Sequence, residues 1–82
     1  MPRIINFTIL GQTYAPDYNG LCGAILEANY DQKNWVTAIC EDGSEERVFF
    51  KSLPMEATWD QITDVSAVIF LRLEEEYEFL AQ

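Results

Sequence analysis

The sequence predicts a small, mainly β domain, with five antiparallel strands in a barrel or sandwich and one short helical turn. Three observations lead to this fold class. Segments rich in β-branched and aromatic residues mostly alternate apolar and polar side chains with a period of two. Turn-forming clusters separate these segments at regular intervals. The 82 residues, 49% of them hydrophobic, suffice for one core in a single domain over residues 1–82.

Each predicted strand rests on its own pattern. In the first, Ile5, Phe7 and Ile9 share one face, and the third is apolar on both faces, which favours a central strand. Asp42 and Gly43 form a tight-turn dipeptide after the third strand, because glycine tolerates positive φ. The predicted strands cover residues 3–10, 21–30, 35–41, 47–53 and 66–73.

Residues 55–64 depart from the strand pattern. Thr58 and Gln61 have the spacing of a capping box, in which a hydroxyl and an amide satisfy the first free N–H groups of a helix. We therefore expect a short helix or 3₁₀ turn over residues 57–64, with Trp59 and Ile62 facing the core.

The C-terminal segment supports two interpretations. Period two places Val65, Ala67, Ile69, Leu71 and Leu73 on one face, whereas a period of 3.6 gives a helical stripe of Ile69, Leu73, Tyr77 and Leu80. The Val-Ile-Phe run at residues 68–70 favours a strand over residues 66–73. Residues 74–82 stay open between strand and helix. The alternative fold class is therefore α+β with a C-terminal helix.

The predicted order of elements resembles the layout of small barrels such as the SH3-like fold. The resemblance covers the order of elements alone. The aromatic peptide-binding motifs of SH3 domains are absent, so the resemblance implies no SH3 function.

The charge balance restricts the class of partner. Fourteen acidic residues against five basic ones give a net charge of −9. A field of this sign repels phosphate backbones and anionic lipid. We therefore expect no direct binding to nucleic acid and no membrane association, and we expect a protein partner with a basic surface. A homodimer is compatible with the sequence.

The two cysteines and the apolar runs indicate a compartment. No apolar stretch reaches the roughly 20 residues of a membrane helix, and the N-terminus lacks the pattern of a signal peptide. We expect a cytoplasmic protein in which Cys22 and Cys40 are reduced and buried. A disulfide between neighbouring strands is the alternative.

Catalytic and metal-binding apparatus is not recognisable. The absence of histidine removes the commonest general base, the usual nucleophile pairs and the usual zinc ligand sets. Residues 17–20 are interpreted as a turn, because the acids that would complete a calcium loop are missing. We predict no catalytic residue, no metal and no cofactor, and hence no enzyme.

The candidate partner-binding residues come from the acidic C-terminal third. On an extended strand Glu74, Glu76 and Glu78 would point the same way at intervals of about 6.6 Å and could imitate a nucleic-acid backbone. A surface that only keeps the protein soluble is the alternative. The predicted site comprises Glu74, Glu75, Glu76, Glu78, Tyr77, Asp60 and Asp64. A second acidic group, around the third turn, comprises Glu41, Asp42, Glu45 and Glu46.

These features predict a non-enzymatic protein-binding module. In this hypothesis the protein is an acidic inhibitor or regulator that occupies the basic, nucleic-acid-binding surface of a partner. Small acidic inhibitors of phages and mobile elements, including anti-CRISPR and anti-restriction proteins, are similar in size and charge. The alternative is an accessory or assembly subunit that docks through an apolar β surface. Trp35, Trp59 and Tyr77 are candidate interface anchors, although core packing is favoured for each.

Overall fold

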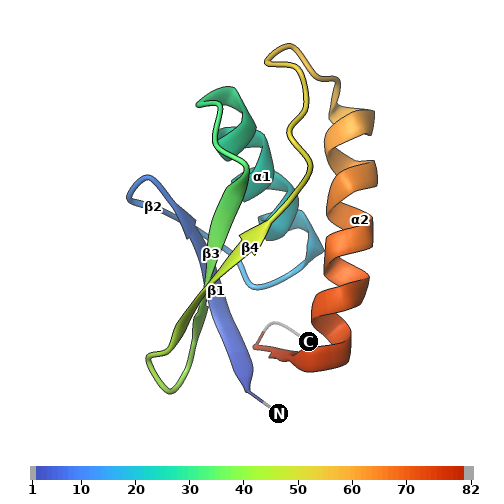
Figure 1. The fold of residues 1–82 in the computed structure, drawn as a ribbon. Helices are drawn as coiled ribbons and strands as arrows, with labels where there is room; N and C mark the ends of the chain where they lie inside the picture. Colours follow the sequence, from blue (N-terminus) through green and yellow to red (C-terminus); the bar gives the residue numbers. More distant parts are fainter. Residues whose placement is uncertain (1, 81–82) are drawn as a thin grey trace.

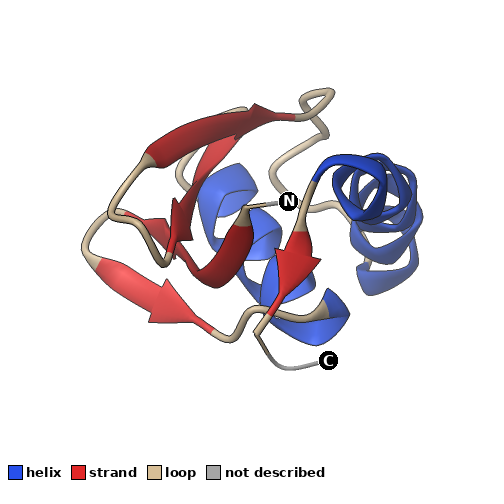
Figure 2. Cartoon of the chain, turned by 90° about the horizontal axis from the view of Figure 1, so that it is seen from below, coloured by secondary structure: helices blue, strands red, loops and turns tan. Residues whose placement is uncertain are grey.

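A computed structural model describes residues 2–80 and has an α+β fold (Figure 1). The elements are β1 (Arg3–Ile9), β2 (Gln12–Tyr14), α1 (Tyr18–Tyr30), β3 (Trp35–Cys40), β4 (Glu45–Phe49), α2 (Trp59–Glu76) and β5 (Glu78–Phe79). Figure 2 shows the strands in one layer, with both helices beside it. The structure has a five-stranded sheet, the predicted number of strands, but the sheet is open and is accompanied by two helices. The α+β alternative with a helix near the C-terminus therefore agrees with the structure, and the mainly β barrel does not.

The sheet is open and has the strand order β2-β1-β3-β4. These four strands pair antiparallel, whereas β5 pairs with β1 in parallel. The predicted first and third strands are confirmed, and β3 lies between β1 and β4, as its apolar faces indicated. The turn at Asp42 and Gly43 is also confirmed, and Gly43 has a φ of 89°. The fourth strand begins and ends earlier than predicted, at Glu45 and Phe49.

A β-bulge changes which residues of β1 face the core. The register with β3 shifts between Ile4 and Asn6, so the alternation skips a residue there. Ile4 and Phe7 are therefore fully buried, whereas Ile5, which was predicted to share a face with Phe7, is half-buried.

The predicted second strand is the helix α1. Asp17 caps its N-terminus, with its carboxylate accepting a 2.7 Å hydrogen bond from the Gly20 N–H. A period of two would place Leu26 and Tyr30 on one face with Cys22, Ala24 and Ala28, but Leu26 and Tyr30 are exposed. The buried residues follow helical spacing instead: Leu21, Ala24, Ile25 and Ala28.

The predicted fifth strand, residues 66–73, lies within α2. The capping box at Thr58 and Gln61 is confirmed and begins an 18-residue helix, not a short turn. The cost of β-branched residues in a helix is below about 1 kcal/mol each, and burial of one face outweighs it. That buried face comprises Ile62, Ser66, Ile69, Phe70 and Leu73. Trp59, predicted to face the core, is 52% exposed.

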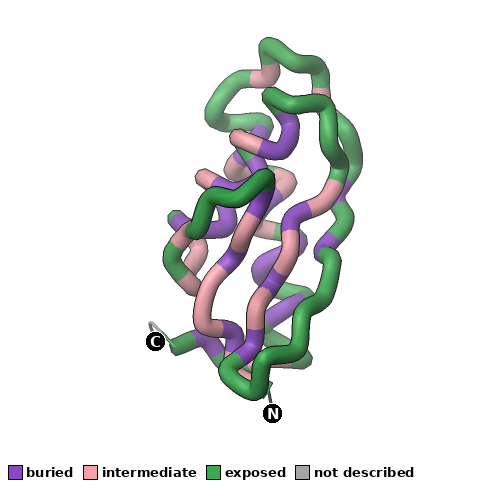
Figure 3. Tube along the Cα trace, turned by 90° about the vertical axis from the view of Figure 1, so that its left-hand side faces the viewer, coloured by how far each residue is buried: buried purple, intermediate pink, exposed green. Residues whose placement is uncertain are grey.

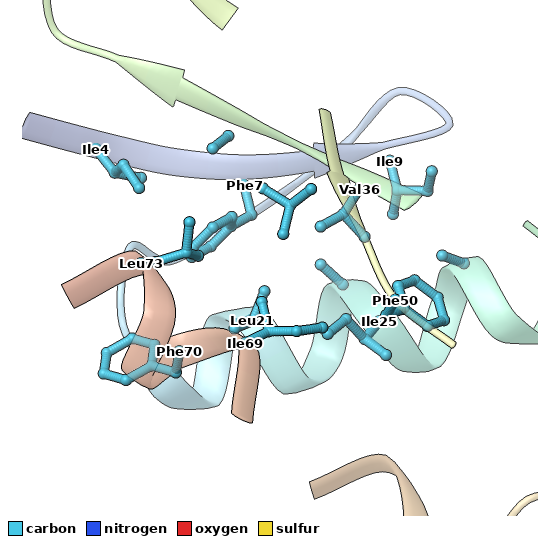
Figure 4. Packing of buried hydrophobic residues seen from close by; sticks show 14 of the residues in the cluster. Ile4, Phe7, Ile9, Leu21, Ile25, Val36, Phe50, Ile69, Phe70 and Leu73 are labelled. Carbon is cyan, nitrogen blue, oxygen red and sulfur yellow. The ribbon is translucent and has the colours of Figure 1, made fainter. Parts of the chain in front are cut away.

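The core lies between the sheet and the two helices. Figure 4 shows Leu21 and Ile25 of α1 close to the side of the sheet that carries Phe7 and Val36, with Leu73 of α2 near Phe7. Asn29 joins α1 to the loop before α2, because its amide donates to the Pro54 carbonyl at 2.9 Å and accepts from the Leu53 N–H at 3.1 Å.

No helix among residues 2–80 covers the other face of the sheet. Along β3 and β4, Trp35 lies opposite Phe49, and Thr37 lies opposite Arg47. Figure 3 shows buried positions alternating with half-buried or exposed ones along the strands. The Arg47 guanidinium lies 3.9 Å from the centre of the Trp35 ring on this face.

Candidate functional site

The glutamates predicted to align along a strand are not aligned in the structure. Glu74, Glu75 and Glu76 form the last turn of α2, where successive side chains rotate by about 100°, and Glu78 lies in β5. All four are exposed. Tyr77 ends the helix and packs, partly buried, against the core. Residues 81–82, part of the segment left open between strand and helix, lie outside the described residues.

Asp60 and Asp64 are far from these glutamates. They lie in the first two turns of α2, and a rise of 1.5 Å per residue puts about 22 Å of helix between Asp60 and Glu75. The seven predicted site residues therefore form two separate groups at opposite ends of one helix.

The structure does bring together two acidic groups that the sequence keeps apart. Figure 1 shows the β3–β4 turn at the same end of the molecule as the C-terminal end of α2. We call this region the acidic end, and its acids are Glu41, Asp42, Glu45, Glu46, Glu74, Glu75, Glu76 and Glu78. All eight are exposed.

The charges of the acidic end are poorly compensated. Among residues 2–80 the structure has one ion pair, between Arg3 and Glu41, with an N–O distance of 3.6 Å. Glu74, Glu75 and Glu76 also occupy the C-terminal turn of α2, which contains no basic residue. A helix C-terminus carries a partial negative charge, so three carboxylates there reduce stability.

Two hollows lie between β4 and α2, and we call them together the β4–α2 groove. The hollow at the acidic end measures about 250 Å³ and is lined by Glu46, Arg47, Val48, Phe49, Arg72, Leu73 and Glu76. The next measures about 280 Å³ and is lined by Phe49, Phe50, Lys51, Val65, Val68 and Ile69. Phe49 belongs to both hollows, which makes them neighbours along β4. One hollow is charged and the other is mainly apolar.

Exposed apolar side chains surround the groove. Phe49 is 55% exposed, and Val68 on the facing side of α2 is 71% exposed. Side chains of this kind mark docking surfaces when they are contiguous. Here they border one apolar hollow.

Two side chains near these elements, Asp42 and Tyr18, have pKa values that differ from their usual ones. The Ser44 side chain and backbone N–H both donate to the Asp42 carboxylate, at 2.6 and 2.9 Å, and hold its pKa below the usual value. Burial raises the pKa of Tyr18, whose hydroxyl donates to the Thr63 carbonyl at 2.9 Å. Both groups stabilise structure, one in the β3–β4 turn and one between the helices.

No group of three histidine, cysteine, aspartate or glutamate side chains in the described part of the chain is placed to hold a metal ion. The prediction for the cysteines is confirmed, since Cys22 and Cys40 are both free and buried. A hollow of about 380 Å³ beside Asn29 is lined by Lys33 and otherwise by uncharged residues.

No helix among the described residues is both long and apolar enough to cross a membrane. Comparisons with protein-family models, with curated proteins and with solved structures found no match.

Sequence reasoning missed the groove. Glu76 was a predicted site residue, and Glu46 belonged to the second acidic group, but nothing indicated that they line one hollow. Val65 and Val68 were assigned to a strand pattern. The helical spacing of Ile62, Ile69 and Leu73, read together with the capping box, would have placed Val68 on an exposed flank of a helix.

Proposed function

We propose that this protein is a non-enzymatic binding module that presents its acidic end to a basic surface of a partner protein. The observation that carries the proposal is the last turn of α2, where Glu74, Glu75 and Glu76 are exposed, without basic neighbours in that turn, and set against the helix dipole. Such an arrangement reduces stability, and pairing with a cationic partner would offset that loss.

A nucleic-acid-binding surface is the kind of basic surface we propose as the target. Eight exposed carboxylates at one end of a chain with a net charge of −9 offer the charge that such a surface binds. Occupying it would make the protein an inhibitor or regulator, of the kind that small acidic phage proteins provide against host defence systems. Asp60 and Asp64 would then lie outside the main contact or extend it along α2.

The test is capture of the partner from a cell lysate on the immobilised protein, followed by its identification and by affinity measurements with the purified pair. We expect binding to weaken steeply with salt, because exposed charges are screened over about 8–10 Å. We also expect DNA or RNA to compete with the protein. A partner that binds nucleic acid and this protein at the same time would contradict the proposal.

Charge variants identify the surface that binds. The triple variant E74Q/E76Q/E78Q should bind the partner much more weakly. The substitutions E27Q, D31N and E56Q remove the same charge from α1 and the following loops, and this matched control should bind as the wild type does. D60N/D64N shows whether the contact extends along α2. Equal loss in every variant would indicate that net charge alone matters.

An accessory subunit that docks through apolar surface is the second candidate. It is favoured by the exposure of two apolar side chains of α2, Val68 at 71% and Leu71 at 64%. V68S/L71S would then abolish association while the glutamate variants retain it, and salt would have little effect.

A further inference from the structure

The edge of β4 that faces away from β3 has no strand beside it among the described residues. The Phe50 N–H donates to the Asn34 carbonyl at 2.9 Å, which fixes the direction of the backbone groups along this strand. Because these groups alternate in direction, those of Arg47 and Phe49 point away from β3. This free edge borders the β4–α2 groove.

The side chains of β4 alternate in the same way. Val48 is buried on the helix-covered face, and Glu46 lies two residues before it on that face. A strand added about 4.8 Å from β4 would follow this alternation. Its inward side chains would enter the apolar hollow beside Phe50 and, two residues along, the charged hollow beside Val48 and Glu46.

The chemistry of the groove restricts what such a strand can carry. The apolar hollow, lined by Phe50 and by Val65 and Val68 of α2, suits an aliphatic side chain. The charged hollow is lined by Glu46 and Arg47 from β4 and by Arg72 and Glu76 from α2. The Arg47 guanidinium lies over Trp35 on the opposite face of the sheet, so it neutralises neither glutamate directly.

Charge also distinguishes between a second copy and a different protein. A second copy would bring another net charge of −9, and its own Glu45 and Glu46, to the same edge. Like charges placed opposite one another in a sheet are destabilising. A basic segment would instead be attracted by the acidic end and would supply a cation to Glu46 and Glu76.

We propose that an extended, basic segment of the partner adds to β4 as a further strand. Its aliphatic side chain occupies the hollow bounded by Phe50, Val65 and Val68, and a lysine or arginine two residues away lies between Glu46 and Glu76. Backbone hydrogen bonds to Arg47 and Phe49 hold the segment in register. This inference rests on the proposed function and specifies its mode of binding.

The experiment uses two synthetic heptapeptides with blocked ends. The first reads Thr-Lys-Thr-Leu-Thr-Lys-Thr, so that a lysine lies two residues from the leucine in either strand direction. The second has glutamate in place of both lysines. Each is titrated into the isotopically labelled protein, and amide exchange is followed by nuclear magnetic resonance. We expect the lysine peptide to slow exchange of the Arg47 and Phe49 amides at least about tenfold, whereas the glutamate peptide leaves them unchanged.

Variants separate the backbone contact from the side-chain contact. Val68→Ala removes one wall of the apolar hollow and should weaken binding about tenfold. Phe49→Pro removes an outward N–H without removing a hydrogen bond to β3, and should weaken binding more than Phe49→Ala does. Leu71→Ala is the matched control, since Leu71 is 64% exposed on α2 and does not line either hollow.

Several outcomes would overturn strand addition. Binding of the lysine peptide with the Arg47 and Phe49 amides unprotected would place the contact elsewhere, and equal binding of the glutamate peptide would remove the charge argument. Binding of neither peptide would indicate that the charges of β4 only protect its edge from aggregation. In these cases a salt-sensitive partner in the capture experiment would leave the proposed function intact. Protection of both amides by self-association, with a dimer in sedimentation, would identify a second copy as the occupant.

Discussion

The two flanks of α2 differ in how they meet the rest of the molecule. On the flank toward α1, the Phe70 ring packs edge-on against Tyr18 at 5.7 Å and stacks on Phe79 at 4.6 Å. On the flank toward β4, Val65, Arg72 and Glu76 border hollows. One flank anchors the helix, and the other is bordered by hollows. In the proposed mode of binding, stability and partner contact therefore depend on different sides of one helix.

The largest expected difference in the free energy of unfolding is between variants on the α1 flank and on the β4 flank of α2. Phe70→Ala should lower the free energy of unfolding by about 3–5 kcal/mol, because it removes a buried aromatic ring and leaves a cavity. Val68→Ala, at a 71% exposed position, should change it by less than about 0.5 kcal/mol. Urea denaturation measures both. Similar losses for the two variants would mean that the β4 flank is also part of the core.

A smaller effect is expected for the hydrogen bond between the helices. Tyr18→Phe removes the donor to the Thr63 carbonyl and should cost about 1 kcal/mol. Because burial raises the folded-state pKa of Tyr18 above the usual 10.0, its stabilising contribution is present below that pH and is lost as the pH rises through the folded value. Stability measured above pH 10 should therefore fall more steeply in the wild type than in Tyr18→Phe. Parallel pH profiles would contradict this assignment.

The smallest effect is expected for the turn between β3 and β4, which lies at the acidic end. The pKa of Asp42 is lowered in the folded state by the Ser44 hydroxyl and backbone N–H. Its contribution is therefore present above the unfolded value of 3.8 and is lost as the pH falls through the folded value. We expect the Ser44 amide resonance to move with pH below about 4, and to stop moving in Asp42→Asn. A Ser44 amide that does not respond in the wild type would show that the hydrogen bond is absent.

The sequence predicted β1, β3, the β3–β4 turn, the capping box and the burial of both cysteines, because each depends on local pattern or composition. It misassigned residues 21–30 and 66–73, where apolar residues are dense enough to satisfy both a period of two and a period of 3.6. The choice between these periods depends on which face is buried in the assembled fold. The pairing of Glu46 with Glu76 around one hollow was equally inaccessible, since it follows from the arrangement of β4 and α2.

The acidic end itself could be predicted only in part. The concentration of glutamates at residues 74–78 was evident from the sequence, but its geometry was not. A strand would have aligned Glu74, Glu76 and Glu78, whereas the last turn of α2 distributes its glutamates around the helix axis. That this group lies at the same end of the molecule as Glu45 and Glu46 follows only from the three-dimensional fold.

The most direct test of the account compares stability and binding in one variant, E74Q/E75Q/E76Q. Removing three carboxylates from the C-terminal turn of α2 should raise the free energy of unfolding by up to about 1 kcal/mol, because the repulsion and the unfavourable helix dipole are relieved. The same variant should bind the captured basic partner at least about tenfold more weakly in isothermal titration calorimetry. A rise in the free energy of unfolding together with a loss of affinity would support the account, in which these glutamates serve binding and lower stability. Unchanged affinity in low and in high salt would contradict the account.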